Sequence, residues 1–239
     1  MKTFRMMTVA SAMAAALPGG FALATPVLAQ SSDHGDWSAT LGAATDNRSK
    51  DASKTNGDPY AYGTVTWTSP SGLFYVAPIG FETIDSSTGS DLELQTYAGL
   101  KTKVAGFGLD LRAAYKYQTD ANPGADEDAF EFTANLTRNF DRIQTRIQVQ
   151  VSPDGTGSVR DWQWVEGRVG YEITDRLVGS VAVGRREQHN SIDYTGWNAG
   201  FAYKATDAID LDLRWYDTDV SNPTDQYAGQ LVAAVAFKF

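Results

Sequence analysis

The stretch that decides the fold closes the chain: Tyr227-Ala228-Gly229-Gln230-Leu231-Val232-Ala233-Ala234-Val235-Ala236-Phe237-Lys238-Phe239. Counted back from the C-terminus, every second residue is apolar, aromatic or Gly, and most residues between them are small or polar. Because side chains alternate between the two faces of a strand, this period predicts a β-strand of about 13 residues. Ordinary strands have about 5–6 residues, so the length and the aromatic residue at each end favour a transmembrane β-strand.

The composition excludes several classes of protein. Hydrophobic residues make up 42% of the 239 residues and charged residues 21%, which fits neither a helical membrane protein nor a disordered chain. Cysteine is absent, so disulfides play no part. The net charge of −9 argues against a nucleic-acid partner, which would require a basic surface. No metal-binding motif such as HExxH occurs, and we expect no metal and no cofactor.

Residues 1–29 have the pattern of a secretory signal peptide. Lys2 and Arg5 precede an apolar run, and small residues end the segment at Val27-Leu28-Ala29. We expect cleavage before Gln30, with the Ala24–Thr25 bond as the second choice. Loss of the two cations lowers the net charge from −9 to −11.

Residues 30–239 form the predicted barrel domain, and from Asp36 onward they repeat one unit, a strand followed alternately by a short turn and by a longer polar loop. The predicted strands span residues 36–46, 59–68, 72–82, 91–102, 108–118, 127–138, 142–152, 161–173, 176–186, 193–204, 208–218 and 226–239. Short turns on one side and long loops on the other are typical of outer-membrane barrels. The sequence therefore predicts an all-β fold, a single 12-stranded antiparallel transmembrane β-barrel in the bacterial outer membrane, with both termini periplasmic.

Aromatic residues of the outward face fall at two heights. The turn-side girdle is predicted to contain Trp37, Trp67, Phe107, Phe140, Tyr171, Tyr203, Phe237 and Phe239. The loop-side girdle is predicted to contain Phe81, Tyr115, Tyr117, Phe130, Phe132, Tyr194, Trp197, Trp215 and Tyr227. A soluble core would concentrate its large rings centrally, so two girdles favour two membrane interfaces.

The inward face is polar and charged, and such groups must contact water or one another. We therefore interpret the barrel as a channel for passive diffusion of small hydrophilic solutes. The predicted pore-lining residues are Arg112, Lys116, Glu131, Arg142, Arg146, Glu166, Arg168, Arg186, Asp210, Asp212 and Arg214. One hypothesis is an anion-favouring basic stripe formed by Arg112, Arg142, Arg146, Arg168 and Arg186. The alternative is neutralisation of these arginines by Glu131, Glu166 and Glu172 on neighbouring strands.

Two further expectations concern the interior. The last strand presents Ala234 and Ala236 beside Ser38, Thr40 and Gly42 of the first, so a clear bore is expected along this seam. Trp162 and Trp164 are expected at the rim of the loop-side girdle. A sugar-stacking surface inside the barrel is the alternative.

The loops offer little chemistry. Asp51, Asp58, Asp85, Asp120, Asp126, Glu127, Asp154, Asp219 and Asp225 are interpreted as solvated turn residues, with divalent bridges to lipopolysaccharide as an alternative. His189 with Asp193 could activate a water molecule, which keeps a barrel-embedded hydrolase open as an alternative, but we expect no catalytic residues and no enzyme. A non-conducting structural or adhesive barrel is the second alternative.

The end of the chain also resembles the C-terminal insertion signal of bacterial outer-membrane proteins, and Tyr227, Phe237 and Phe239 would carry it. The implied partners are outer-membrane lipid, lipopolysaccharide, periplasmic chaperones and the barrel-assembly machinery. The whole chain resembles the TorF-type porin family of proteobacterial outer-membrane proteins, on the segments 39–46, 57–59, 69–75 and 92–99. It departs from that family at residues 47–50 and 77–80. The resemblance implies a barrel in the outer membrane.

Overall fold

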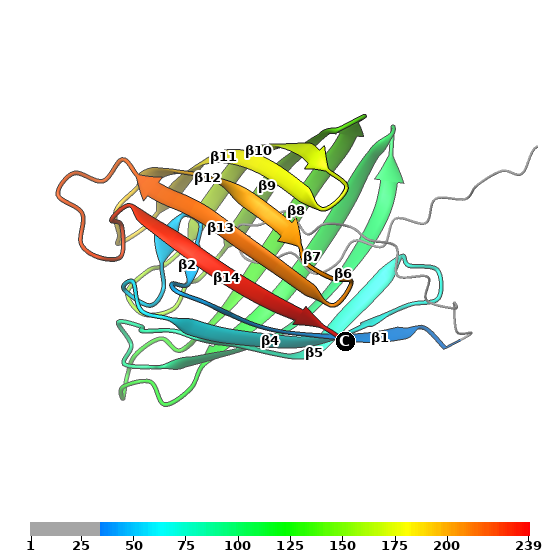
Figure 1. Cartoon of the computed structure of the whole chain (residues 1–239). Coiled ribbons are helices and arrows are strands. Elements are labelled where there is room, and N and C mark those ends of the chain that lie inside the picture. Colours follow the sequence, from blue (N-terminus) through cyan, green and yellow to red (C-terminus); the bar gives the residue numbers. More distant parts are fainter. Residues whose placement is uncertain (1–33) are drawn as a thin grey trace, which may run out of the picture.

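A computed structural model describes residues 34–239, and these form a closed antiparallel barrel (Figure 1). The predicted signal peptide lies outside the described residues. Around the barrel the strands follow the order β1-β14-β13-β12-β11-β10-β9-β8-β7-β6-β5-β4, and β1 pairs with both β14 and β4. The predicted 12-stranded fold is confirmed. Among residues 34–239, no helix is long and apolar enough to cross a membrane.

The wall strands agree with the predicted ones to within a few residues at most ends. They are β1 (Asp36–Ala44), β4 (Tyr60–Thr68), β5 (Phe74–Thr83), β6 (Leu92–Val104), β7 (Phe107–Gln118), β8 (Asp128–Phe140), β9 (Ile143–Ser152), β10 (Trp162–Thr174), β11 (Leu177–Gln188), β12 (Tyr194–Lys204), β13 (Ile209–Thr218) and β14 (Gln230–Lys238). The largest difference is at β14, which begins at Gln230 rather than at residue 226 because residues 225–227 form a turn.

Alternation of the two faces is clearest in β10. Trp162, Trp164, Glu166 and Arg168 are buried inside the barrel, whereas the residues between them are exposed on its outer surface. Large apolar side chains are exposed around the whole outer wall, among them Ile147, Val169, Val181, Phe201, Leu213 and Leu231. This inversion, apolar outside and charged inside, is typical of a wall that faces lipid.

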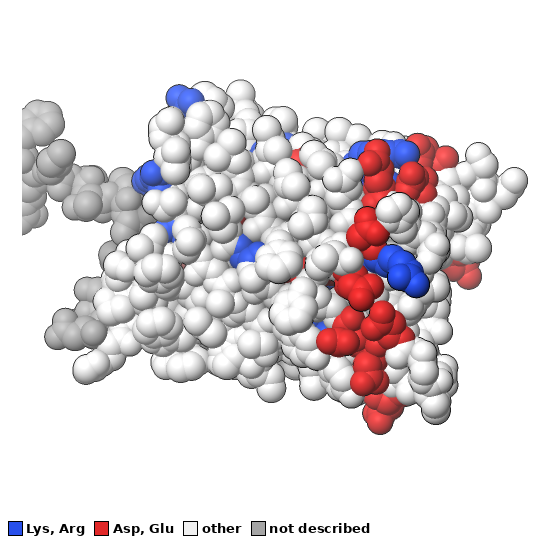
Figure 2. All heavy atoms as spheres, turned by 180° about the vertical axis from the view of Figure 1, so that it is seen from behind, with Lys and Arg blue, Asp and Glu red and all other residues white. Residues whose placement is uncertain are grey.

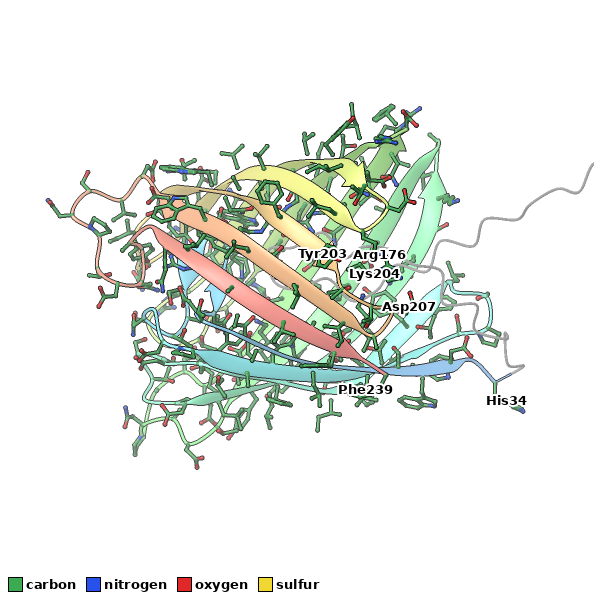
Figure 3. All side chains as sticks on the ribbon, in the orientation of Figure 1. His34, Arg176, Tyr203, Lys204, Asp207 and Phe239 are labelled. Carbon is green, nitrogen blue, oxygen red and sulfur yellow. The ribbon has the colours of Figure 1, made fainter. Side chains whose placement is uncertain are left out.

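Two residues assigned to the loop-side girdle face the interior instead. Tyr194 and Tyr227 are buried, and their rings meet edge to face with centroids 5.3 Å apart. Tyr227 precedes β14 in the turn, so the alternation of the strand does not extend to it. Its predicted place on the same outward face as Phe237 and Phe239 is therefore wrong. Phe237 and Phe239 do face outward, and Phe239 is 74% exposed (Figure 3).

The loops at one end of the barrel are joined by hydrogen bonds. Gln118, at the end of β7, accepts a hydrogen bond from Thr88 (2.7 Å) and donates one to Thr156 (3.1 Å), which links the loops that follow β5 and β9. Acidic residues form a band near this end on the face that Figure 2 shows. Asp51, however, is buried, so its interpretation as a solvated acidic loop residue is wrong.

Candidate functional site: the lumen and its infolded hairpin

The loop between β1 and β4 folds into the barrel. It contains two short paired strands, β2 (Arg48–Ser49) and β3 (Ala52–Ser53), and we call residues 46–58 the infolded hairpin (Figure 1). The two-residue turn at its tip, Lys50-Asp51, has φ of 55° and 64°, as a type I′ turn requires. Neither residue is Gly or Asn, and each left-handed residue costs roughly 1–3 kcal/mol, so the surrounding contacts must hold the tip in place.

One side of the hairpin is held by a cluster of carboxylates. Glu82 of β5, Glu93 of β6 and Glu131 of β8 converge with Lys116 of β7, whose Nζ lies 2.9 Å from Glu93 and 3.5 Å from Glu131. Lys54 of the hairpin enters the same cluster, 3.0 Å from Glu93. The three acids therefore attract cations of the hairpin into the interior.

The opposite side is held by β12, β13 and β14. Asn198 donates a hydrogen bond to Asp51 (2.6 Å) and accepts one from Arg214 (2.9 Å), which is fully buried. Arg48 donates to Gln230 of β14 (3.0 Å). Since the hairpin contacts strands on both sides of the barrel, it crosses the lumen at the loop end.

Aromatic side chains surround the tip. Trp164, only 1% exposed, packs with Trp162, Tyr194, Tyr227 and Ala52 of the hairpin. Lys50 Nζ lies 4.3 Å from the centre of a Trp162 ring, and the Arg186 guanidinium lies 4.4 Å from the same residue. Both tryptophans thus point inward, so their expected place at the rim of the girdle is wrong. They pack on the hairpin.

The turn half of the lumen contains ion pairs, some within one strand and some between neighbouring strands. Arg146 and Arg168 both bond to Glu166, at 2.6 Å and 3.2 Å. Arg214 pairs with Asp212 at 3.1 Å and Lys238 pairs with Asp210. Near the turns, Lys204 pairs with Asp207 at 2.6 Å, beside Arg176 and Tyr203 (Figure 3).

Most residues predicted to line the pore are buried inside the barrel, and their pore-lining role stays a prediction. Arg112 stacks on Tyr97, with 5.3 Å between its guanidinium carbon and the ring centre. Arg186 also donates to Gln188 (2.8 Å). Arg142 is the exception, because it lies exposed in the β8–β9 turn and not in the wall. Within the proposed basic stripe, two of the five arginines share Glu166, as the alternative described.

The seam between β1 and β14 is filled. Tyr60, Tyr216, Val232 and Ala44 form a buried cluster there, with Tyr62 packed against it. A Cβ atom on Gly42 would lie 2.3 Å from the Tyr62 ring, so this ring covers the small residue. The expected clear bore along the seam is therefore wrong, because tyrosines of β4 and β13 occupy the space that small residues of β1 and β14 leave.

His189 pairs with Asp161 rather than with Asp193. Both partners are exposed in loops, and the hydrogen bond raises the pKa of His189 and lowers that of Asp161. Asp193 instead accepts from the Gln188 backbone N–H (2.8 Å). The dyad proposed for water activation is not formed. No group of three or more His, Cys, Asp or Glu side chains within residues 34–239 is arranged to hold a metal ion.

Sequence reasoning missed Lys50, Asp51 and Lys54, which place the hairpin in the lumen. One signal for them was available. Residues 47–58 are the longest connection between predicted strands, and they carry Arg48, Lys50 and Lys54, whereas no other long loop carries more than one Lys or Arg. Cations concentrated in one loop match the acids Glu82, Glu93 and Glu131 inside the wall.

The fold and the lumen define a class: a small closed 12-stranded antiparallel β-barrel with an apolar outer wall and a charged interior. The protein belongs to the family described as bacterial protein of unknown function (Gcw_chp), which matches residues 29–238. A comparison with curated proteins finds no match.

Solved structures share this fold. The KdgM porin in complex with disordered oligogalacturonate has a TM-score of 0.60 at 8% identity, covering 84% of this chain and 99% of that one. The NanC porin has a TM-score of 0.57 at 11% identity, covering 85% and 100%. The COG4313 outer membrane channel from Pseudomonas putida F1 also has a TM-score of 0.57 at 11% identity, covering 86% and 96%. At such low sequence identities, the similarity shows a shared fold and nothing more.

Proposed function

We propose that this protein is an outer-membrane channel through which small hydrophilic solutes diffuse passively. The observation that carries the proposal is the inversion of the barrel, whose outer wall is apolar and whose interior is lined by charged side chains. Even paired charges are costly to bury in a dry interior, so these groups favour a lumen that contains water. The similar folds of the KdgM and NanC porins support the same function. The resemblance to the TorF-type porin family supports it as well.

The location and partners follow from the same proposal. A signal peptide at residues 1–29 would direct residues 30–239 to the periplasm, where chaperones and the barrel-assembly machinery would receive the chain. The exposed Phe237 and Phe239 at the end of β14 would serve as the insertion signal. Lipid and lipopolysaccharide would then surround the apolar wall. Fractionation of cell envelopes tests this location.

We expect the lumen to favour anionic solutes weakly over cationic ones. Among the described residues, cationic side chains of the turn half of the lumen outnumber anionic ones. The cations are Lys101, Arg112, Arg146, Arg168, Lys204, Arg214 and Lys238, and the anions are Asp110, Glu166, Glu172, Asp210 and Asp212. Rings of cationic side chains favour anions in pores, so we expect small anions or acidic sugars to pass more readily.

Purified protein in planar bilayers and liposomes tests conduction and size limit together. We expect single-channel steps and swelling of liposomes in small sugars and amino acids, with a reversal potential in a KCl gradient that indicates anion preference. Absence of steps from folded protein would favour the non-conducting barrel. A clear cation preference would contradict only the proposed bias.

A further inference from the structure

The base and the tip of the infolded hairpin are held in different ways. At the base, the Asp46 carboxylate pairs with Arg48 and accepts hydrogen bonds from Ser53 and Thr55, the latter at 2.9 Å. The Lys54 backbone N–H also donates to the Asn47 carbonyl (2.7 Å). These bonds hold the two arms of the hairpin together as one unit, which also contacts the wall through Asn47 (3.1 Å from Glu82) and Lys54 (3.0 Å from Glu93).

At the tip, two adjacent residues of opposite charge contact opposite walls. Lys50 Nζ lies over Trp162 of β10 and 3.8 Å from Glu131 of β8. Asp51 reaches toward β12, where its Oδ1 accepts from Asn198, while its buried Oδ2 has no hydrogen-bond partner. Tyr194 donates to the Lys50 carbonyl (2.8 Å). The tip therefore buries two ionisable groups, Lys50 with a long ion pair of 3.8 Å to Glu131 and Asp51 with one carboxylate oxygen that has no hydrogen-bond partner among residues 34–239.

The charged groups around the tip do not compensate for this burial. Lys50 faces Glu131, which favours its charge, and Arg186, Lys116 and Lys54, which oppose it. Burial is the largest cause of its shift and lowers the pKa of Lys50 to about 7.

Burial is also the largest cause at the neighbouring residue and raises the pKa of Asp51 to about 7. Glu166 raises this pKa further, whereas the hydrogen bond from Asn198 and the charges of Arg168 and Arg214 lower it.

We propose that the infolded hairpin is a proton-operated gate, docked across the lumen when Asp51 is protonated and released when Asp51 is charged near neutral pH. The gate rests on the proposed channel function. Docking raises the pKa of Asp51 from its ordinary value near 4, so acidification from about pH 7 to about pH 4 favours the docked state. Docking lowers the pKa of Lys50, so alkaline pH above about 7 also favours the docked state, and release is greatest near neutrality.

Conductance of the full chain in planar bilayers at pH 5, 7 and 9 tests the gate. One proton taken up on docking changes the ratio of docked to released channels by up to about tenfold per pH unit, so we expect the open fraction to fall at pH 5 and at pH 9. Asp51→Asn keeps an oxygen that can accept from Asn198 but stays neutral at every pH, like protonated Asp51, so its open fraction at pH 7 should fall toward that at pH 5. Lys50→Met is uncharged at every pH, like deprotonated Lys50, so its open fraction at pH 7 should fall toward that at pH 9.

A variant with residues 48–53 replaced by Gly and Ser separates the two proposals. It should conduct at all three pH values, and its folding can be checked by the heat-dependent gel mobility of barrels. A folded variant that never conducts would overturn the channel function. If this variant conducts while the wild-type conductance is independent of pH, or if Asp51→Asn opens at pH 7 as fully as the wild type, the gate is overturned and the channel stands.

Discussion

Gly196 of β12 leaves the space that Asp51 of the infolded hairpin occupies: a Cβ atom on Gly196 would lie 2.5 Å from the Asp51 Cβ. Real Cβ contacts are not this short, so a side chain at Gly196 and the docked hairpin exclude each other. The absence of one methyl group in the wall thus permits the tip to reach Asn198, which it contacts at 2.6 Å. The position of the hairpin therefore depends on a residue distant in sequence.

The first prediction is that Gly196→Val displaces the hairpin tip. Forcing methyl groups into packed space costs roughly 1–3 kcal/mol, which would act on docking because the hairpin can move more easily than the wall. We expect a higher single-channel conductance and a weaker pH dependence than in the wild type. Gly167→Val is the matched control, since a Cβ at Gly167 meets nothing within 4 Å. Equal conductance of the two variants would contradict the displacement.

The second prediction concerns Glu166, which Arg146 and Arg168 share at 2.6 Å and 3.2 Å. Glu166→Gln removes the acid and leaves two neighbouring cations, so anion preference should increase in the reversal potential. Removing one partner of a buried pair costs roughly 3–5 kcal/mol, and the denaturant midpoint should fall accordingly. Gln148→Glu, on the neighbouring strand and paired in register with Glu166, should shift the reversal potential the opposite way. An unchanged reversal potential in Glu166→Gln would show that the solute does not pass this pair.

The architecture could be predicted from the sequence because period-2 alternation, strand length and turn spacing are local signals. Strands such as β10 and β13 alternate without interruption, so the sequence indicates which of their residues lie on the same face. Arg142 and Tyr227 were misplaced because each lies just outside a strand, where alternation no longer fixes direction. The filled seam was missed because Tyr62 and Tyr216 cover small residues on adjoining strands. A side chain that extends over a neighbouring strand leaves no signal in the sequence of either strand.

The infolded hairpin shows more clearly which part of the structure could not be predicted from the sequence. Its turn residues, Lys50-Asp51, are not those that a type I′ turn normally selects, so local propensity indicates no hairpin. Tertiary contacts with Glu131, Trp162 and Asn198 decide its conformation, and those residues are distant in sequence. The wall residues of the candidate site were therefore predicted, whereas the loop that crosses the lumen was missed.

The third prediction concerns insertion. Phe239→Ala removes the exposed terminal ring proposed as part of the insertion signal and should lower the amount of folded barrel in the outer membrane. Removing one Phe ring from contact with lipid costs at most about 1.5–3 kcal/mol of transfer free energy, which alone would not prevent assembly. Phe140→Ala, another exposed aromatic near a turn, is the control with the same chemistry. Equal yields of both variants in outer-membrane fractions would assign Phe239 an anchoring role only.

The fourth prediction concerns the exposed pair His189 and Asp161. The hydrogen bond raises the pKa of His189, so its stabilising effect is complete below pH 6.5 and disappears as pH rises through the raised pKa. The same bond lowers the pKa of Asp161, so its effect is complete above pH 3.8 and disappears as pH falls through the lowered pKa. The link between the two loops should therefore be strongest between about pH 4 and 6.5.

Asp161→Asn tests this link without disturbing the lumen, because both side chains are exposed. An NMR titration should show the pKa of His189 falling toward its ordinary value of about 6.5 in the variant. Asp193→Asn is the control, since the Asp193 charge contributes to the shift but is not its first cause. A larger fall in Asp193→Asn than in Asp161→Asn would mean that His189 pairs with Asp193 in solution, and would restore that dyad as a candidate for activating water.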